Sequence, residues 1–159
     1  MRRFESEVLK LGDALRARGA MLATAESCTG GLIAATCTSV AGSSDWFERG
    51  FVTYSNAAKI EMLGIDAALI AAHGAVSAEV ACAMAEGALV HSRASLAVAV
   101  TGIAGPSGAT PGKPVGTVWF ALARRGGAAV AELLQLDGDR SAVREQTLAH
   151  ALRRLLEIA

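Results

Sequence analysis

Residues 21–40, MLATAESCTGGLIAATCTSV, contain the order of elements on which the fold depends. Residues 21–25 form an apolar run of strand length, and 26–31 form a polar turn with two glycines. Residues 32–40 form a second, longer apolar run that predicts a helix. A strand that leads through a tight turn into a helix is the repeating unit of α/β proteins, so this stretch predicts a helix packed on a sheet.

The segments on either side extend this pattern. Residues 4–18 carry apolar side chains at three- and four-residue steps and stop at Gly19, which predicts an amphipathic helix. In chain order the remaining predictions are a strand (46–54), a helix capped by Ser55 and ended by Gly64, a helix from Ser77 to about Ser92, a strand (96–100), a hairpin (115–123 with 128–136) and a last helix after Asp137. We therefore expect one domain over residues 1–159, a three-layer α/β/α sandwich with a mixed, mostly parallel sheet.

The composition excludes several classes of protein. Of 159 residues, 15 are Lys or Arg and 15 are Asp or Glu, and no basic run exceeds a pair, which argues against nucleic acid or a membrane surface as partner. No apolar stretch is long enough to span a membrane, and no signal sequence is recognisable, so we expect a cytoplasmic protein. The three cysteines cannot all pair with one another and lack CxxC spacing, so neither a disulfide framework nor a zinc site is indicated. No cofactor is expected. Abundant alanine and glycine predict closely packed layers.

Two glycine-rich loops are the candidate ligand sites, because ligands of open α/β sheets bind beyond the carboxyl ends of the strands. In the first, Ser27 and Thr29 precede a helix N-terminus, whose N–H groups can hold a phosphate or an oxyanion. Simple capping by these side chains is the alternative. The second, residues 101–114, is long for a loop in a compact domain, although an ordinary surface loop has the same composition. Neither loop matches a nucleotide-binding fingerprint.

A serine nucleophile needs a base, and the three histidines are poorly placed for that role. They lie in a turn, at a helix end and in the last helix, and the chain has no GxSxG elbow. Lys59, flanked by apolar residues just after Tyr54, is the stronger candidate. A lysine acts as a base only when neutral, which requires burial, and a solvated helix lysine is the alternative. Glu26, beside the serine, would favour the charged lysine if it faced inward.

Seven motifs occur in one order along the chain: TAESCTGG (24–31), GSS (42–44), GFVTYSN (50–56), HGAVS (73–77), TGIAGP (101–106), KPVGTV (113–118) and GDR (138–140). Together, over about residues 5 to 157, they resemble the CinA C-terminal domain family, in its stand-alone form. The resemblance implies hydrolysis of the carboxamide of nicotinamide mononucleotide (NMN) to the nicotinate form with release of ammonia. It also implies a serine/lysine mechanism without metal.

The resemblance implies roles for the matching residues. Ser27 would be the nucleophile, Lys59 its general base, and Tyr54 a neighbour that orients groups or relays a proton. Ser44 is a second candidate serine and is also expected among the substrate-binding residues. The expected binding residues are Thr29, Gly30 and Gly31, whose N–H groups would stabilise the oxyanion, Thr101, Gly102 and Gly105 as walls of the phosphate site, and Arg140 as a phosphate contact, with Lys113 as a weaker alternative.

Two other functions compete with the enzyme. One is a non-catalytic domain that binds pyridine nucleotides for regulation, and the other is a flavodoxin-like flavin protein. Because NMN carries a phosphate and a pyridinium charge, its pocket needs a local anion site and no overall positive charge. Small residues on helix faces favour a homo-oligomer, with a dimer expected.

Overall fold

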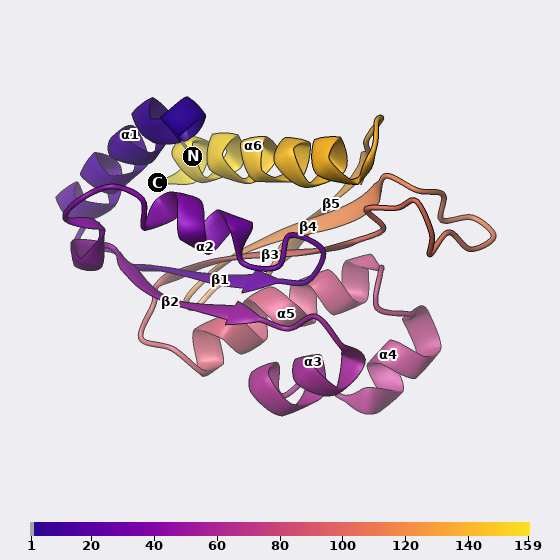
Figure 1. Cartoon of the computed structure of the whole chain (residues 1–159). Coiled ribbons are helices and arrows are strands. Elements are labelled where there is room, and N and C mark those ends of the chain that lie inside the picture. Colours follow the sequence, from indigo (N-terminus) through magenta and orange to yellow (C-terminus); the bar gives the residue numbers. More distant parts are fainter. Residues whose placement is uncertain (1) are drawn as a thin grey trace.

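The computed structural model describes residues 2–159 and contains one sheet with the strand order β2-β1-β3-β4-β5 (Figure 1). The strands are β1 (Leu22–Glu26), β2 (Phe47–Val52), β3 (Leu96–Gly102), β4 (Thr117–Arg124) and β5 (Val130–Gln135). β1 pairs in parallel with β2 and β3, whereas β4 pairs antiparallel with β3 and β5. The predicted mixed sheet is confirmed. Parallel pairing does not predominate, however, because β4 forms two antiparallel pairs, with β3 and with β5, against the two parallel pairs of β1.

Helices cover both faces of the sheet, which confirms the three-layer sandwich (Figure 1). One layer contains α1 (Glu5–Ala17), α2 (Leu32–Cys37) and α6 (Arg140–Ile158), and the other contains α3 (Asn56–Leu63), α4 (Ala67–His73) and α5 (Ala78–Val90). The short helix α4 is the one helix in this set that the sequence analysis does not predict. Its local signal is Asp66, whose carboxylate accepts the N–H of Ala68 at 2.9 Å.

The two faces of the sheet differ in the size of their side chains. Successive residues of a strand point to opposite faces. In β3, Leu96, Val98 and Val100 pack against the layer of α1, α2 and α6, whereas Ala97 and Ala99 pack against α5. The buried residues of α5 in this core include the small Ala81, Ala85 and Ala88 beside the larger Val80 and Met84. The alanine-rich composition therefore lets α5 lie close to the sheet.

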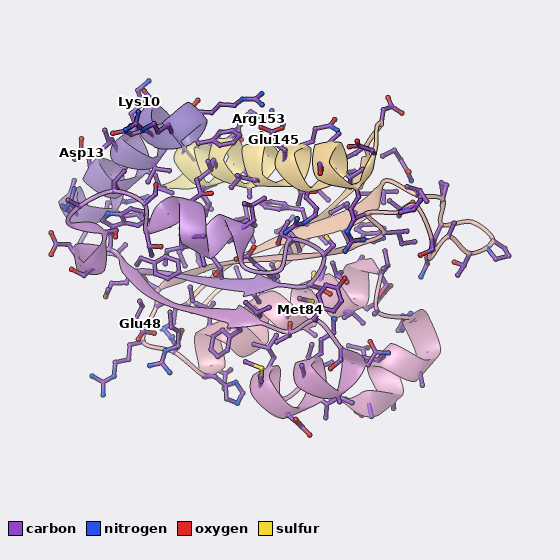
Figure 2. All side chains as sticks on the ribbon, in the orientation of Figure 1. Lys10, Asp13, Glu48, Met84, Glu145 and Arg153 are labelled. Carbon is purple, nitrogen blue, oxygen red and sulfur yellow. The ribbon has the colours of Figure 1, made fainter. Side chains whose placement is uncertain are left out.

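The labelled charged side chains lie on the outside of the molecule, whereas Met84 lies inside it (Figure 2). Lys10 and Asp13 of α1 and Glu145 and Arg153 of α6 are exposed, whereas Met84 of α5 is fully buried. No helix within residues 2–159 is both long and apolar enough to cross a membrane.

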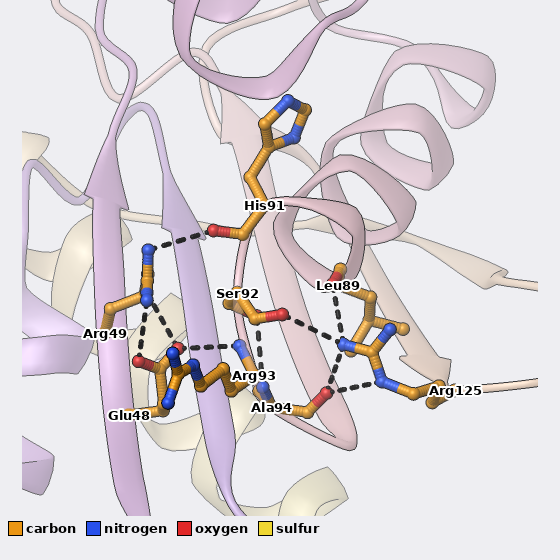
Figure 3. Close-up of polar contacts among 8 residues, drawn as sticks. All are labelled: Glu48, Arg49, Leu89, His91, Ser92, Arg93, Ala94 and Arg125. Carbon is orange, nitrogen blue, oxygen red and sulfur yellow. Dashed lines mark hydrogen bonds and ion pairs between the residues drawn. The ribbon is translucent and has the colours of Figure 1, made fainter.

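At one edge of the sheet, polar contacts hold the connection between α5 and β3 (Figure 3). Arg125, which follows β4, donates at 2.6 to 3.2 Å to three carbonyls of this connection, those of Leu89, Ser92 and Ala94. From β2, the Glu48 carboxylate accepts the N–H of Arg93 at 3.0 Å. The carboxyl ends of the parallel strands lie at the opposite edge, where Ser27 follows β1 and Thr53 follows β2.

Candidate active site

Ser27 and Lys59 meet at the carboxyl ends of two neighbouring parallel strands. Ser27 follows β1, and Lys59 lies on the first turn of α3, which begins shortly after β2. The side chain of Ser55 caps α3 by accepting the N–H of Ala58, which fixes where this turn begins. Lys59 Nζ lies 2.9 Å from Ser27 Oγ in a hydrogen bond, and the two residues are only 1% and 8% exposed. The predicted pairing of these residues is therefore present in the fold.

The burial of Lys59 makes its amine easier to deprotonate than an exposed lysine. Burial lowers the pKa of Lys59 from the ordinary 10.5, against a smaller opposing effect of the Cys28 thiol. Nζ also donates to the carbonyl oxygens of Thr53, at 2.8 Å, and Tyr54, at 3.4 Å. None of the ion pairs formed by residues 2–159 includes this lysine. With two carbonyls holding its N–H groups, a neutral amine would direct its lone pair at Ser27, and the alternative of a solvated lysine is wrong.

Glu26 is the neighbour whose role the sequence left open. It is 1% exposed, and its carboxylate faces helix α2 rather than Lys59. It accepts the hydroxyl of Thr29 at 2.6 Å and the N–H groups of Ile33 and Ala34, both at 2.9 Å. A carboxylate thus occupies the N-terminus of α2. The N–H groups of Ile33 and Ala34 are therefore not available to a phosphate or an oxyanion, and the Thr29 hydroxyl donates to the capping carboxylate.

The turn after Ser27 still offers N–H groups for an oxyanion. Gly30 N–H donates to the Ser27 carbonyl at 3.0 Å, so it is already used. The N–H groups of Cys28, Thr29 and Gly31 donate to no other residue within 2–159. Gly30 and Gly31 have φ of +59° and +104°, values that side-chain-bearing residues rarely adopt, so the turn itself requires them. Thr29 is the predicted residue here that keeps a free N–H beside the serine.

A cavity of about 240 Å³ opens in front of the serine and lysine. Its walls include Ser27, Cys28, Tyr54, Lys59, Thr101 and Arg140. A neighbouring hollow of about 440 Å³ shares Ala104 and Arg140 with it. A larger hollow of about 590 Å³ lies between α1 and α6, but it contains neither Ser27 nor Lys59. The first two hollows together form the candidate active site.

Arg140 joins two sides of this cavity. It is the first residue of α6, where the Asp139 side chain caps the helix. Its guanidinium donates to the Tyr54 hydroxyl at 3.0 Å and to the Gly105 carbonyl at 2.9 Å. The Tyr54 hydroxyl therefore bonds to Arg140, and not to Ser27 or Lys59 as a proton relay would require.

Thr101 and Gly102, which the sequence places in the second loop, are the last residues of β3, and both line the cavity. Thr101 donates its hydroxyl to the Ala75 carbonyl at 2.9 Å. At Gly102 a Cβ would lie 2.6 Å from Val118 Cγ2, so close strand packing explains this glycine. Gly105 has φ of +83°, which again favours glycine.

Ser44 and Lys113 are candidate residues that lie away from the cavity. Ser44 belongs to the short helix Ser43–Asp45 before β2, at the amino end of a strand whose carboxyl end meets Ser27. The expectation of a second active-site serine at Ser44 is therefore wrong, because the length of β2 separates it from Lys59. Lys113, the weaker phosphate candidate, donates to the His73 carbonyl at 3.1 Å and does not line the cavity.

Other reactive groups do not replace the serine and lysine. No histidine lines the Ser27 cavity within residues 2–159. Cys28 does line it, but burial raises the pKa of its thiol to about 11, so the thiol stays protonated at neutral pH. In the same part of the chain, no group of three or more His, Cys, Asp or Glu is placed to hold a metal ion.

Known proteins resemble this chain in sequence and in structure. The nicotinamide-nucleotide amidohydrolase PncC of Escherichia coli (strain K12) is 54% identical over 155 residues, 95% of this chain and 94% of that protein. PncC of Pseudomonas putida is 54% identical over 149 residues, 94% of this chain and 92% of that protein. The crystal structure of a competence-damaged protein (CinA) superfamily protein from Escherichia coli matches with a TM-score of 0.94 at 34% identity, over 98% of this chain and 90% of that one.

A second solved structure is also similar to this chain in fold and sequence. The competence/damage inducible protein CihA from Agrobacterium tumefaciens has a TM-score of 0.87 and 45% identity, over 95% of this chain and 94% of that one. The family model described as the CinA C-terminal domain matches residues 5–159. The chain therefore belongs to the CinA C-terminal domain family.

Proposed function

We propose that this protein hydrolyses the carboxamide of nicotinamide mononucleotide to the nicotinate form and ammonia, a reaction of pyridine nucleotide salvage. The observation that carries the proposal is the buried hydrogen bond of 2.9 Å between Lys59 Nζ and Ser27 Oγ at the wall of a cavity. Relatives about 54% identical over most of the chain are named nicotinamide-nucleotide amidohydrolases, so the chain is an amidase.

In the first step Ser27 Oγ attacks the carboxamide carbon and its proton passes to neutral Lys59. A tetrahedral intermediate forms, whose oxygen carries the negative charge. The N–H groups of Cys28 and Thr29 are free to stabilise it, as oxyanion sites do in other acyl transfers. Protonated Lys59 then gives its proton to the leaving nitrogen, the C–N bond breaks, and ammonia departs from an acyl-serine.

In the second step water attacks the acyl-serine and loses a proton to Lys59. The ester bond to Ser27 breaks, Lys59 returns the proton to the serine oxygen, and the nicotinate form leaves. The overall reaction consumes one water and releases one ammonia for each NMN. The burial that lowers the pKa of Lys59 lets one side chain act as base and acid in turn.

The two adjoining hollows suit the two parts of the substrate. The cavity at Ser27 takes the pyridine carboxamide, and the hollow that shares Arg140 takes the ribose and the phosphate. Arg140 is a phosphate contact in this arrangement, with Tyr54 holding its guanidinium and Thr101, Gly102 and Gly105 nearby as walls. An exposed end of one arginine provides the local anion site that a chain of zero net charge needs.

Ammonia release from NMN tests the proposal. We expect turnover by the native protein and a loss of at least about 10³-fold in Ser27→Ala and Lys59→Met, since members of a nucleophile–base pair act as a unit. Ser44→Ala is the matched serine control and keeps native turnover. Binding of NMN without ammonia release by the native protein would instead indicate a non-catalytic nucleotide-binding domain, and visible flavin absorbance would indicate a flavin protein.

Two further proposals rest on the sequence. A homodimer is expected, and sedimentation of the purified protein measures it directly. A cytoplasmic location is expected as well, and fractionation of cells that express the tagged chain tests it.

A further inference from the structure

Arg144 lies behind the turn that carries the serine. It is on α6, one helical turn beyond Arg140, and is half-buried. Its guanidinium donates to two carbonyls of the serine turn, that of Thr29 at 3.0 Å and that of Cys28 at 3.3 Å. None of the ion pairs formed by residues 2–159 includes Arg144. The Arg144 guanidinium therefore binds backbone carbonyl oxygens of the turn, and it has no part in the proton transfers proposed for Ser27 and Lys59.

The contact with the Cys28 carbonyl fixes the direction of a neighbouring N–H. A trans peptide unit is planar, with its C=O and N–H groups pointing to opposite sides. The Cys28 carbonyl and the Thr29 N–H belong to one such unit. By holding the carbonyl toward α6, Arg144 directs the Thr29 N–H away from α6.

The two residues before Thr29 face the proposed reaction. Ser27 and Cys28 line the Ser27 cavity, whereas Thr29 and Arg144 lie directly behind them. Thr29 is fully buried, yet its N–H donates to no other residue within 2–159. A buried N–H group without an acceptor lowers the stability of the folded protein, and a bound group that supplies an acceptor removes this penalty. The negatively charged oxygen of the tetrahedral intermediate is a group that would complete it.

A second charged side chain holds the same turn from its other end. The Glu26 carboxylate binds the Thr29 hydroxyl and two N–H groups of α2. The guanidinium and the carboxylate therefore bind different polar groups of the turn. They leave the N–H groups of Cys28, Thr29 and Gly31 without an acceptor in another residue, and the first two of these directly follow Ser27.

We propose that Arg144 is a positioning residue for the oxyanion site: it holds the Cys28 and Thr29 carbonyls so that the Thr29 N–H stays directed at the oxygen of the tetrahedral intermediate. The proposal rests on the proposed amide hydrolysis. Arg144 does not touch the substrate, so its effect is on the transition state and not on substrate binding.

The test compares Arg144→Met and Arg144→Lys with the native protein in ammonia release from NMN. We expect kcat to fall by about 10- to 100-fold in Arg144→Met, less than the roughly 10²- to 10³-fold loss of a whole oxyanion donor, with KM within about twofold. Arg144→Lys recovers part of kcat, because an ammonium still reaches one carbonyl. The pH profile keeps its shape, since Lys59 is untouched. Arg153→Met, which removes an exposed arginine from the same helix, keeps native kcat.

Binding measured in a Ser27→Ala background separates positioning from a general loss of structure. We expect Ser27→Ala with and without Arg144→Met to bind NMN with Kd values within about twofold. Native kcat in Arg144→Met would overturn the proposal, and so would a rise in Kd and KM that matches the loss of kcat/KM. Absence of ammonia release by the native protein would instead overturn the proposed function itself, so the two failures are distinguishable.

Discussion

Lys59 is the residue whose surroundings differ most from those its type prefers. Lysine is rarely buried unless paired, yet Lys59 is 1% exposed and forms no ion pair within residues 2–159. Its partners are two carbonyl oxygens and the Ser27 hydroxyl. An ionisable side chain that is buried without an ionic partner is typical of catalytic and binding sites.

The pH dependence of turnover follows from the lowered pKa of Lys59. Burial lowers this pKa below the ordinary 10.5. A protonated Lys59 cannot accept the serine proton, so we expect kcat/KM to rise with pH as the amine deprotonates, on an acid limb centred below 10.5. A profile measured from pH 5 to 10 checks this. A rate that falls as pH rises through neutrality would contradict the role of Lys59 as base.

The same lowered pKa predicts an effect on stability. Below the ordinary lysine pKa the unfolded chain binds a proton at Lys59 more readily than the folded one, so the native protein gains stability as pH rises. Lys59→Met lacks this titration. Urea unfolding at pH 6, 8 and 10 should therefore show the free energy of unfolding of Lys59→Met, relative to the native protein, greatest at pH 6 and smallest at pH 10. A difference independent of pH would argue against the burial effect.

Glu26 contributes to stability through the N-terminus of α2. Glu26→Gln replaces a carboxylate that accepts three hydrogen bonds with an amide that has one acceptor atom. We expect the free energy of unfolding to fall by about 1–3 kcal/mol, as measured by urea denaturation. Glu61→Gln, at an exposed position of α3, is the matched control, with a change within about 0.5 kcal/mol. Equal effects in the two variants would show that the buried cap contributes nothing special.

At the scale of elements, close packing of α3 on α5 depends on Gly87. A Cβ at Gly87 would lie 2.4 Å from the carbonyl oxygen of Leu63, the last residue of α3. The Leu63 backbone cannot easily move away from an added methyl group. We therefore expect Gly87→Ala to lower the free energy of unfolding by about 1–3 kcal/mol, despite the better helix propensity of alanine. Thermal or urea unfolding measures this. Gly127→Ala, whose Cβ would have its nearest contact at 3.6 Å, is the glycine control.

Local signals predicted most of the elements. Ser55, Ser77 and Asp139 each accept an N–H at the start of a helix, and capping depends only on residues close in sequence. The sequence does not predict α4 because its seven residues, AALIAAH, are short of two helical turns and almost all apolar, so they display no helical period.

At the scale of the whole molecule, the polar contacts of Figure 3 lie at the opposite edge of the sheet from Ser27 and Lys59. Arg125→Met removes a guanidinium that binds three carbonyls there. We expect a loss of about 1–3 kcal/mol in the free energy of unfolding, with kcat and KM for NMN within about twofold of native. Unfolding and turnover measured on the same preparation check both. A large loss of kcat at unchanged stability would show that the two edges are coupled.

The sequence by itself determined the α/β class, most helix and strand positions, and the residue types that could act as nucleophile and base. It did so because periodicity, caps and turn glycines act over a few neighbouring residues, and because the motifs around Ser27 and Lys59 are specific. The tertiary structure decided which candidates meet. It buried Lys59 beside Ser27, turned Glu26 toward α2, gave the Tyr54 hydroxyl to Arg140, and placed Ser44 at the far end of β2. These outcomes depend on strand order and on contacts between residues far apart in the chain, which no local pattern contains.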